Sequence, residues 1–233
     1  MKSVLISIRS KWCEKICHVI GKEETGKPIY EKRIEVRKSA PKEVPFKAYI
    51  YATRPKKFYK CGAVSTSDEL LWLANGKVEM GDGFKFWADG DEYQCLNGRI
   101  IGEFICDRIE MINAKCSDYG IDLFYHDCLT NGCLTEREIE KYFNIPEDKD
   151  LRVMKGNGYA WHISDLKIYD KPKELSEFRK PLDRVWGSYC NDYCDRGCIS
   201  FGNTDYSCND YWDWEKGLTR PPQSYMFVEE VEQ

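Results

Sequence analysis

Apolar and polar residues alternate along much of the chain, and this period of two predicts that strands predominate. The alternating segments are rich in β-branched and aromatic residues, and they cover residues 3–8, 29–38, 44–53, 99–112, 158–170 and 224–231. We expect segments 29–38 and 44–53, which are consecutive, to pair as neighbours. The long segment 99–112 turns Ile101, Phe104 and Cys106 toward a core, so we expect it to be central.

Helical signals are fewer. Ser10 can cap a helix that runs to about Ile20, with Trp12, Ile16 and Ile20 on one stripe. Thr135 and Glu138 have capping-box spacing and predict a short helix over 136–143. Gly- and Asp-rich turns predict hairpins inserted over 54–98. Together the elements predict an α+β class, or a small open β-barrel with flanking helices, as a single domain over residues 1–233.

Composition limits the classes of partner. The net charge is −4 and the isoelectric point about 5.6, so a nucleic-acid site would have to be a local basic patch. Hydrophobic residues at 42% and aromatic residues at 14% argue against a disordered chain. No apolar run reaches the roughly 18–20 residues of a membrane span, and the apolar part of the first segment is too short for a secretory signal. We therefore expect a cytoplasmic protein without membrane contact; the sequence leaves the oligomeric state open.

The chain has 12 cysteines, of which eight are scattered through periodic segments and are expected to be buried free thiols. The other four, Cys190, Cys194, Cys198 and Cys208, lie in a turn-rich segment over 186–217. Four thiolates in such a segment suit a closed structural zinc site, which leaves no position for a catalytic water. The spacing also places three of them on one helical face, and an iron–sulfur cluster, free thiols or disulfides stay open as alternatives.

The segment KRIEVRK, residues 32–38, carries the most distinctive charge pattern. On a strand, Arg33, Glu35 and Arg37 share one face. Arg37 offers a planar fork suited to a phosphate or a base edge, Lys32 offers a point charge, and Glu35 is expected to orient Arg37. The alternative is a solvated ladder of surface charges with little energetic weight.

Other residues extend the candidate site, each with an ordinary structural alternative. A basic rim can combine Lys11, Lys32, Arg37, Lys38, Lys56, Lys57 and Lys60, or these can be ordinary surface lysines and arginines. Trp12, Tyr159 and Trp161 can stack on an unpaired base or pack in the core. His162 can act as a general base or read a base, or be buried and hydrogen-bonded. Gln223, after two prolines, can present its amide to a ligand or simply start an edge strand, and Glu103 is an acid–base candidate if it lies near Lys32.

Several of these motifs resemble one family. Residues 6–9 with Lys11, followed by Lys32-x-x-Glu35-x-Arg37, are similar to the opening of the ASCH family, a branch of the PUA-like superfamily with a GxKxxExR pattern. The glycine of that pattern is replaced here by Tyr30. Residues 101–104, 158–163 and 220–224 also resemble phage and prophage members. The segments 54–98 and 186–217 lie outside the common core.

The resemblance implies a small β-barrel with a cleft beside the first helix that binds RNA or a nucleobase-like molecule. We therefore predict a module that binds RNA, single-stranded nucleic acid or a modified nucleotide in a cleft lined by Lys32, Glu35 and Arg37. One alternative is a hydrolase acting on a modified nucleoside, or a ribonuclease, with Lys32 and Glu103 as catalytic residues. The amidohydrolase members carry Thr-x-x-x-Lys where this chain has Pro28 before Lys32. Another alternative is a phage protein that binds a host factor through its acidic insertions.

Overall fold

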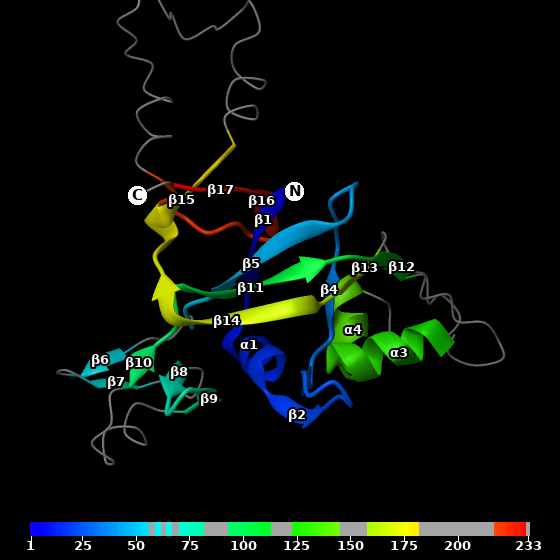
Figure 1. Cartoon of the computed structure of the whole chain (residues 1–233), viewed down its shortest axis with the longest axis horizontal. Coiled ribbons are helices and arrows are strands. Elements are labelled where there is room, and N and C mark those ends of the chain that lie inside the picture. Colours follow the sequence, from blue (N-terminus) through cyan, green and yellow to red (C-terminus); the bar gives the residue numbers. More distant parts are fainter. Residues whose placement is uncertain are drawn as a thin grey trace, which may run out of the picture.

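The computed structural model describes residues 1–55, 59–61, 64–66, 70–81, 93–112, 123–144, 158–181 and 217–231. Two larger sheets and a few short helices make up this part of the chain (Figure 1). Its helices are α1 (Ser10–Cys17), α3 (Leu123–Gly132), α4 (Glu136–Phe143) and the 3-10 helix η2 (Leu175–Glu177). Strands with few helices agree with the predicted α+β class.

The larger sheet has five strands in the order β14 (Ser164–Lys173), β11 (Ile100–Cys106), β5 (Phe46–Ala52), β1 (Ser3–Ile8) and β16 (Tyr225–Phe227). Strands β1 and β5 run parallel, and the other neighbours are antiparallel. Side-chain alternation gives the sheet two apolar faces. One face contributes Val4, Ile6 and Phe104 to the main core, where Cys13 and Ile16 of α1 also lie. The opposite face contributes a second apolar cluster; its members include Leu5, Tyr49, Tyr51 and Ile100.

The second sheet consists of β12 (Ile109–Ile112), β13 (Gly158–His162) and β4 (Ile34–Arg37), with α3 and α4 beside it (Figure 1). Val36 of β4 packs with Ile139 and Phe143 of α4 in a separate core cluster. A Cβ atom on Gly158 would lie 2.5 Å from Phe143 Cζ, so only glycine lets α4 approach β13 this closely. The contact holds α4 next to β4.

Four further sheets, one of three strands and three of two strands, complete the described strands. They pair β2 (Val19–Lys22) with β3 (Pro28–Tyr30), β6 (Tyr59–Cys61) with β7 (Val64–Thr66), β8 (Leu71–Ala74) with β9 (Lys77–Met80) and β10 (Gln94–Cys95), and β15 (Phe178–Arg179) with β17 (Glu229–Glu230). These strands and those of the two larger sheets form no closed barrel. No helix in the part of the chain that the structure describes is long and apolar enough to cross a membrane.

The predicted strand pairing was wrong in one place, and several strand lengths need correction. Strand β4 pairs with β13, whereas β5 pairs with β1 and β11, so segments 29–38 and 44–53 are not neighbours. Segments 99–112 and 158–170 each supply two strands that belong to different sheets. The reason is physical: apolar alternation continues across a bend, so the pattern does not show where a strand leaves one sheet for another.

The first helix also differs from the prediction at both ends. Arg9 is the N-cap and makes no side-chain cap bond, while Ser10 lies inside the helix. The Ser10 hydroxyl instead accepts a hydrogen bond from Asn97 Nδ2 at 2.8 Å. The helix ends at Cys17 because Val19 already pairs with Tyr30 in the β2–β3 hairpin.

Candidate functional site

Lys32, Glu35 and Arg37, called the triad below, converge as the sequence predicted, but within the protein interior. Their exposed fractions are 2%, 6% and 6%. Lys32 Nζ lies 3.4 Å from Glu35 Oε2, and Arg37 Nε lies 2.9 Å from Glu35 Oε1, although its N–H is not aligned for a hydrogen bond. Glu35 therefore links both cations. These side chains do not form the solvated charge ladder of the alternative interpretation, because they are buried. Removal of one partner would leave an uncompensated buried charge and would therefore be costly.

The remaining donors of Arg37 reach main-chain oxygens of two distant segments. Nη2 donates to the Ser7 carbonyl oxygen at 2.8 Å, and Nη1 donates to the Ser224 carbonyl oxygen at 3.5 Å. Ser7 belongs to β1, and Ser224 immediately precedes β16. Arg37 thus ties the second sheet to one end of the five-stranded sheet, with Glu35 holding the guanidinium from the other side.

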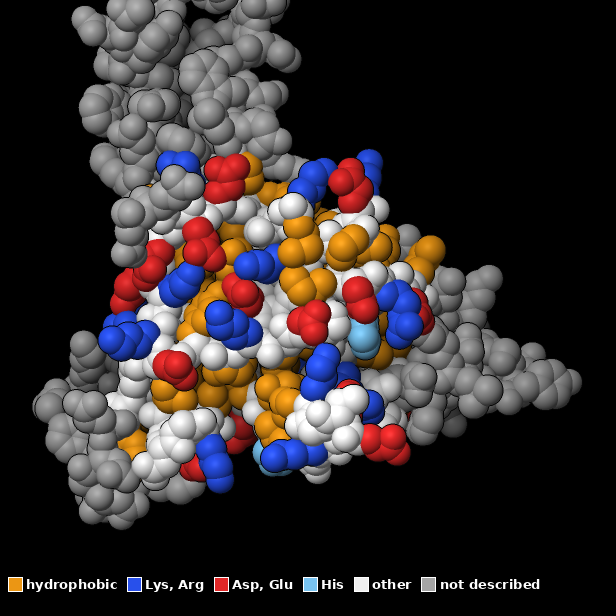
Figure 2. Space-filling view, in the orientation of Figure 1, with side chains coloured by type: hydrophobic (Ala, Val, Ile, Leu, Met, Phe, Trp, Pro, Cys, Tyr) orange, Lys and Arg blue, Asp and Glu red, His pale blue; other side chains and the backbone are white. Residues whose placement is uncertain are grey.

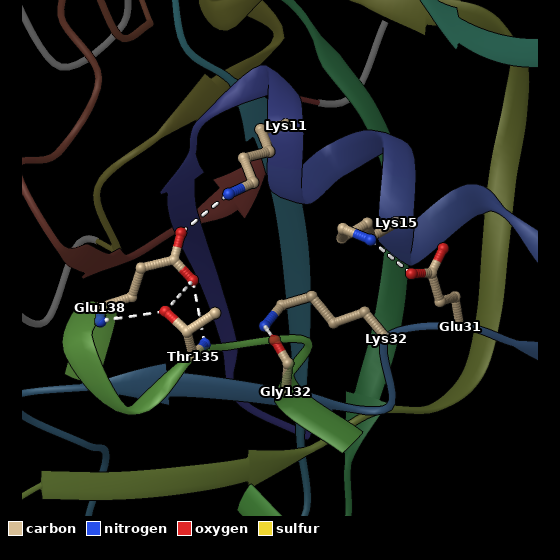
Figure 3. Close-up of polar contacts among 7 residues, drawn as sticks. All are labelled: Lys11, Lys15, Glu31, Lys32, Gly132, Thr135 and Glu138. Carbon is tan, nitrogen blue, oxygen red and sulfur yellow. Dashed lines mark hydrogen bonds and ion pairs between the residues drawn. The ribbon is translucent and has the colours of Figure 1, made fainter. Parts of the chain in front are cut away.

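Lys32 extends between α1 and the end of α3 (Figure 3). Its Nζ donates to the Gly132 carbonyl oxygen at 2.7 Å and lies 5.3 Å from the centre of the Trp12 ring. The main chain is held by α1 as well, because Lys32 N donates to the Lys15 carbonyl oxygen at 3.1 Å. Lys15 also pairs with Glu31. These contacts fix Lys32 as a buried positive charge beneath a partly exposed tryptophan ring.

Lys11 joins α1 to α4, and it lies above Lys32 in the view of Figure 3. Lys11 Nζ lies 2.8 Å from Glu138 Oε1 and 4.5 Å from the centre of the Trp12 ring. The other carboxylate oxygen of Glu138 accepts hydrogen bonds from Thr135 N and Thr135 Oγ1, at 3.0 and 3.1 Å. Glu138 N donates in turn to Thr135 Oγ1, which confirms the predicted capping box. Partial burial raises the pKa of the Glu138 carboxyl, but the hydrogen bonds from Lys11 and Thr135 outweigh burial and hold that pKa below its usual value.

A second aromatic ring lies near the other end of the triad. Tyr142 of α4 is 39% exposed, and Lys38 Nζ lies 5.1 Å from its ring centre. Burial raises the pKa of Tyr142; Arg37 lowers it and Glu35 raises it, so the hydroxyl lies in the field of the triad. The triad is thus accompanied by two rings, Trp12 and Tyr142, each with a lysine ammonium over it.

The N-terminal turn of α1, which carries Lys11 and Trp12, is anchored through Asn97. Its amide nitrogen donates to Ser10 Oγ at 2.8 Å and to the Thr53 carbonyl oxygen at 2.9 Å, while its oxygen accepts from Leu71 N at 2.8 Å. One buried amide therefore holds α1, the end of β5 and β8 together. Nothing in the alternation of the sequence marks Asn97 for this role.

The other predicted ligand-binding residues are Trp161, His162 and Gln223, and their surroundings differ from those of Lys11 and Trp12. Trp161 shares the β4–β13 register with Glu35, yet it is 0% exposed and packs edge-on against Phe46 and Tyr225. A buried ring cannot stack on a base. His162 pairs with Ile34 in the register and its Nδ1 lies 2.6 Å from Asp107 Oδ1, so it does not join the triad. Gln223 is exposed and directly precedes Ser224.

Glu103 lies on the opposite face of the five-stranded sheet from Lys32. It is directly opposite Tyr49 in the β11–β5 register, and Tyr49 belongs to the second apolar cluster. Lys32, in contrast, adjoins Trp12, which packs on the main core. The structure therefore does not bring together the acid–base pair that the hydrolase alternative requires.

The group around Glu103 is called the far-face network. Glu103 Oε2 accepts a hydrogen bond from Tyr169 at 2.6 Å, and Lys47 Nζ lies 3.2 Å from Oε1. Glu230 has the same kind of partners: it accepts from Tyr49 at 2.6 Å and pairs with Lys173 at 2.7 Å. Burial and the adjacent carboxylates raise the pKa of both tyrosines. Each carboxylate thus has one lysine and one tyrosine.

The predicted metal site cannot be placed. Cys190, Cys194, Cys198 and Cys208 lie outside the described residues, as do Lys56 and Lys57 of the predicted rim, and the side chain of Lys60 is likewise not described. Within the described ranges, no three His, Cys, Asp or Glu residues form a group that could hold a metal ion. The cysteines described there are free thiols: Cys13, Cys17, Cys95, Cys106, Cys128 and Cys133. Structural zinc stays a prediction.

Sequence reasoning missed three contributors to the site. Tyr142 and Glu138 lie one turn apart on α4, and Gly132 contributes only its carbonyl oxygen. The sequence predicts Glu138 only as part of a helix cap. A pattern of exposed residues on a short amphipathic helix gives no sign of which strand it covers, so their position beside β4 could not be inferred.

Comparisons with known proteins give little sequence support. No model of a known protein family matches the chain, and no curated protein matches it. Similar solved structures include ASCH from Zymomonas mobilis, at 15% identity and a TM-score of 0.44, covering 98% of this chain and 88% of that chain. Two mutant forms of the same protein match at 14% and 13% identity, with TM-scores of 0.44 and 0.42, covering 98% of this chain and 89% and 91% of theirs.

Proposed function

We propose that this protein binds nucleotides or single-stranded nucleic acid on the surface formed by Lys11, Trp12, Lys38 and Tyr142 above the triad. The observation that carries the proposal is the pairing of each ring with a lysine beside a buried cluster of excess positive charge. Phosphates bind to lysine ammonium groups, and unpaired bases stack on aromatic rings. Two such pairs suit a short stretch of backbone and bases.

The charge balance of the region supports this proposal. The cations Lys11, Lys32, Arg37 and Lys38 are accompanied by two carboxylates, Glu35 and Glu138. Ser7, Gly132 and Ser224 supply carbonyl oxygens, which satisfy donors without removing a positive charge. A protein with a net charge of −4 therefore has a local cationic region, as the sequence required of any nucleic-acid site.

The triad acts as a support for this surface. Lys32, Glu35 and Arg37 are too buried for a base to stack against them, so they would act through their charge and by holding α1, β4 and Ser224 in place. Contacts with the ligand would come from the exposed lysines and the two rings. In this proposal the ligand therefore binds to a surface that lies over the buried triad, and not in the predicted cleft lined by the triad.

Binding of labelled single-stranded RNA and DNA oligomers, followed by fluorescence anisotropy over a range of salt, tests the proposal. We expect Lys11→Ala and Lys38→Ala each to weaken binding about threefold to tenfold and to reduce the salt slope by about 0.7 per lost phosphate contact. Trp12→Ala should weaken binding further through the loss of stacking, worth about 1–3 kcal/mol per base. The same samples, analysed for cleaved oligomer, report ribonuclease activity.

Lys2→Ala is the matched control. Lys2 pairs with Glu43 at 2.8 Å and its side chain is 56% exposed, values close to the 2.8 Å and 54% of Lys11 with Glu138. Lys2 lies at the start of β1, whereas the triad lies near its end. Equal weakening by Lys2→Ala and Lys11→Ala would contradict the proposed surface, and no binding of any oligomer at low salt would contradict the function itself.

A further inference from the structure

The two carboxylate oxygens of Glu138 have different partners. Glu138 Oε1 contacts Lys11 Nζ at 2.8 Å, whereas Oε2 accepts both hydrogen bonds of the α4 cap. The cap keeps the carboxylate in place whether or not Lys11 is present. Lys11 can therefore leave Glu138 for another anion without loss of the helix cap.

The surroundings of Lys11 favour an anion with more charge than a carboxylate. The side chains of Lys11 and Glu138 are 54% and 36% exposed, and pairs this exposed contribute little stability. Lys32 adds a buried positive charge on the same ring, because its Nζ lies 5.3 Å from the Trp12 centre and that of Lys11 lies 4.5 Å from it. A phosphate at Lys11 would gain from both charges.

We infer that the Glu138 carboxylate occupies the position on Lys11 that a phosphate of a bound nucleotide takes, so that Glu138 is an internal competitor of that phosphate and lowers the affinity for phosphate-bearing ligands. This inference rests on the proposed function and adds a residue that regulates it. A nucleoside can stack on Trp12 but brings no charge that replaces Glu138. An acidic side chain at this place also weakens the binding of any ligand whose anion competes poorly with a carboxylate.

Glu138→Gln separates the competing charge from the helix cap. The glutamine oxygen can still accept from Thr135 N, while its neutral amide no longer pairs with Lys11 as an ion. We expect labelled single-stranded RNA to bind about two- to fivefold more tightly to this variant, which is the range set by a surface ion pair. The selectivity for uridine 5′-monophosphate over uridine, measured by displacement of the labelled RNA, should increase, because only the phosphate-bearing ligand is released from competition with Glu138.

Glu136→Gln is the control for general charge. Glu136 is exposed in the same first turn of α4, and among the described residues it has no ion pair. The Glu136→Gln substitution removes the same charge from the same helix and leaves the Lys11–Glu138 pair unchanged. In a Lys11→Ala background, the gain from Glu138→Gln should disappear, since the competition acts through that lysine.

The outcomes distinguish this inference from the proposed function. Tighter binding by Glu138→Gln, absent in Glu136→Gln and in the Lys11→Ala background, supports it. Binding by the native protein with no difference between the two glutamine variants overturns the inference and leaves the function standing. Weaker binding by Glu138→Gln, with an unchanged melting temperature, also overturns it, because Glu138 would then contact the ligand. No binding by any variant overturns the function itself.

Discussion

Two clusters of charged residues lie on opposite faces of the five-stranded sheet, and the charges in each are compensated by different kinds of partner. In the far-face network, each carboxylate has its own lysine and its own tyrosine. In the triad, one carboxylate serves two cations, and main-chain carbonyls supply the other acceptors. In Figure 2, acidic and basic side chains lie interspersed over the region of β11 and β14.

The difference teaches how to tell a structural charge cluster from a cationic support for binding. Pairing by side chains of opposite sign cancels charge, so the far-face network has little field left to attract a ligand. Carbonyl dipoles satisfy the donors of Lys32 and Arg37 while the net charge stays positive. Lysines lie over rings in both clusters, but Lys173, which lies over the Tyr169 ring on the far face, is paired with Glu230, whereas Lys38 over Tyr142 adds its charge to that of the triad. We therefore propose the triad side as the binding side.

The largest expected effect comes from Glu35→Gln. The substitution leaves Lys32 and Arg37 buried without a counter-charge, so we expect the free energy of unfolding to fall by about 3–5 kcal/mol. Denaturation by guanidinium chloride measures it. Glu103→Gln on the far face, where the side chain is 19% exposed, is the matched control and should cost less. Equal losses would mean that the two clusters do not differ in the way described.

A smaller effect is expected from Tyr169→Phe. The variant removes one hydrogen bond to a carboxylate that keeps Lys47, so unfolding should become easier by about 1–2 kcal/mol. Oligonucleotide affinity should not change, because Tyr169 contacts Glu103 on the face away from Lys32. Anisotropy titration of the folded variant measures this. Weaker binding would place the ligand on the wrong face for our proposal.

The smallest expected effect is the response to acid. The pKa values of Glu138 and Glu230 lie below the usual 4.5; burial alone raises them, and hydrogen bonds from Lys11 and Thr135, or from Lys173 and Tyr49, outweigh that. Because the folded-state pKa is depressed, the stabilisation is complete above about pH 4.5 and is lost as the pH falls through the folded-state values. Melting temperatures measured from neutral pH down to about pH 3 should therefore decline at the acid end. In Glu230→Gln the decline should be smaller; an identical decline would contradict the assignment.

Much of the triad could be predicted because it depends on residues that are close together in the sequence. A period of two places Glu35 and Arg37 on one face of β4, and the spacing of Thr135 and Glu138 is enough to predict the cap. What could not be predicted is non-local. Tyr142 and Gly132 reach β4 only because α3 and α4 fold onto it, and the failed pairing of 29–38 with 44–53 has the same origin.

The main-chain acceptors of the triad also affect how the protein can change over evolutionary time. Ser7, Gly132 and Ser224 contribute carbonyl oxygens to Lys32 and Arg37, and any amino acid carries such an oxygen. A Cβ atom on Gly132 would meet its neighbours only at 3.6 Å, an ordinary contact. Homologues could therefore diverge at Gly132 and Ser224 while the cations stay bound, whereas Ser7 is further constrained because its hydroxyl donates to the Pro222 carbonyl oxygen at 2.6 Å.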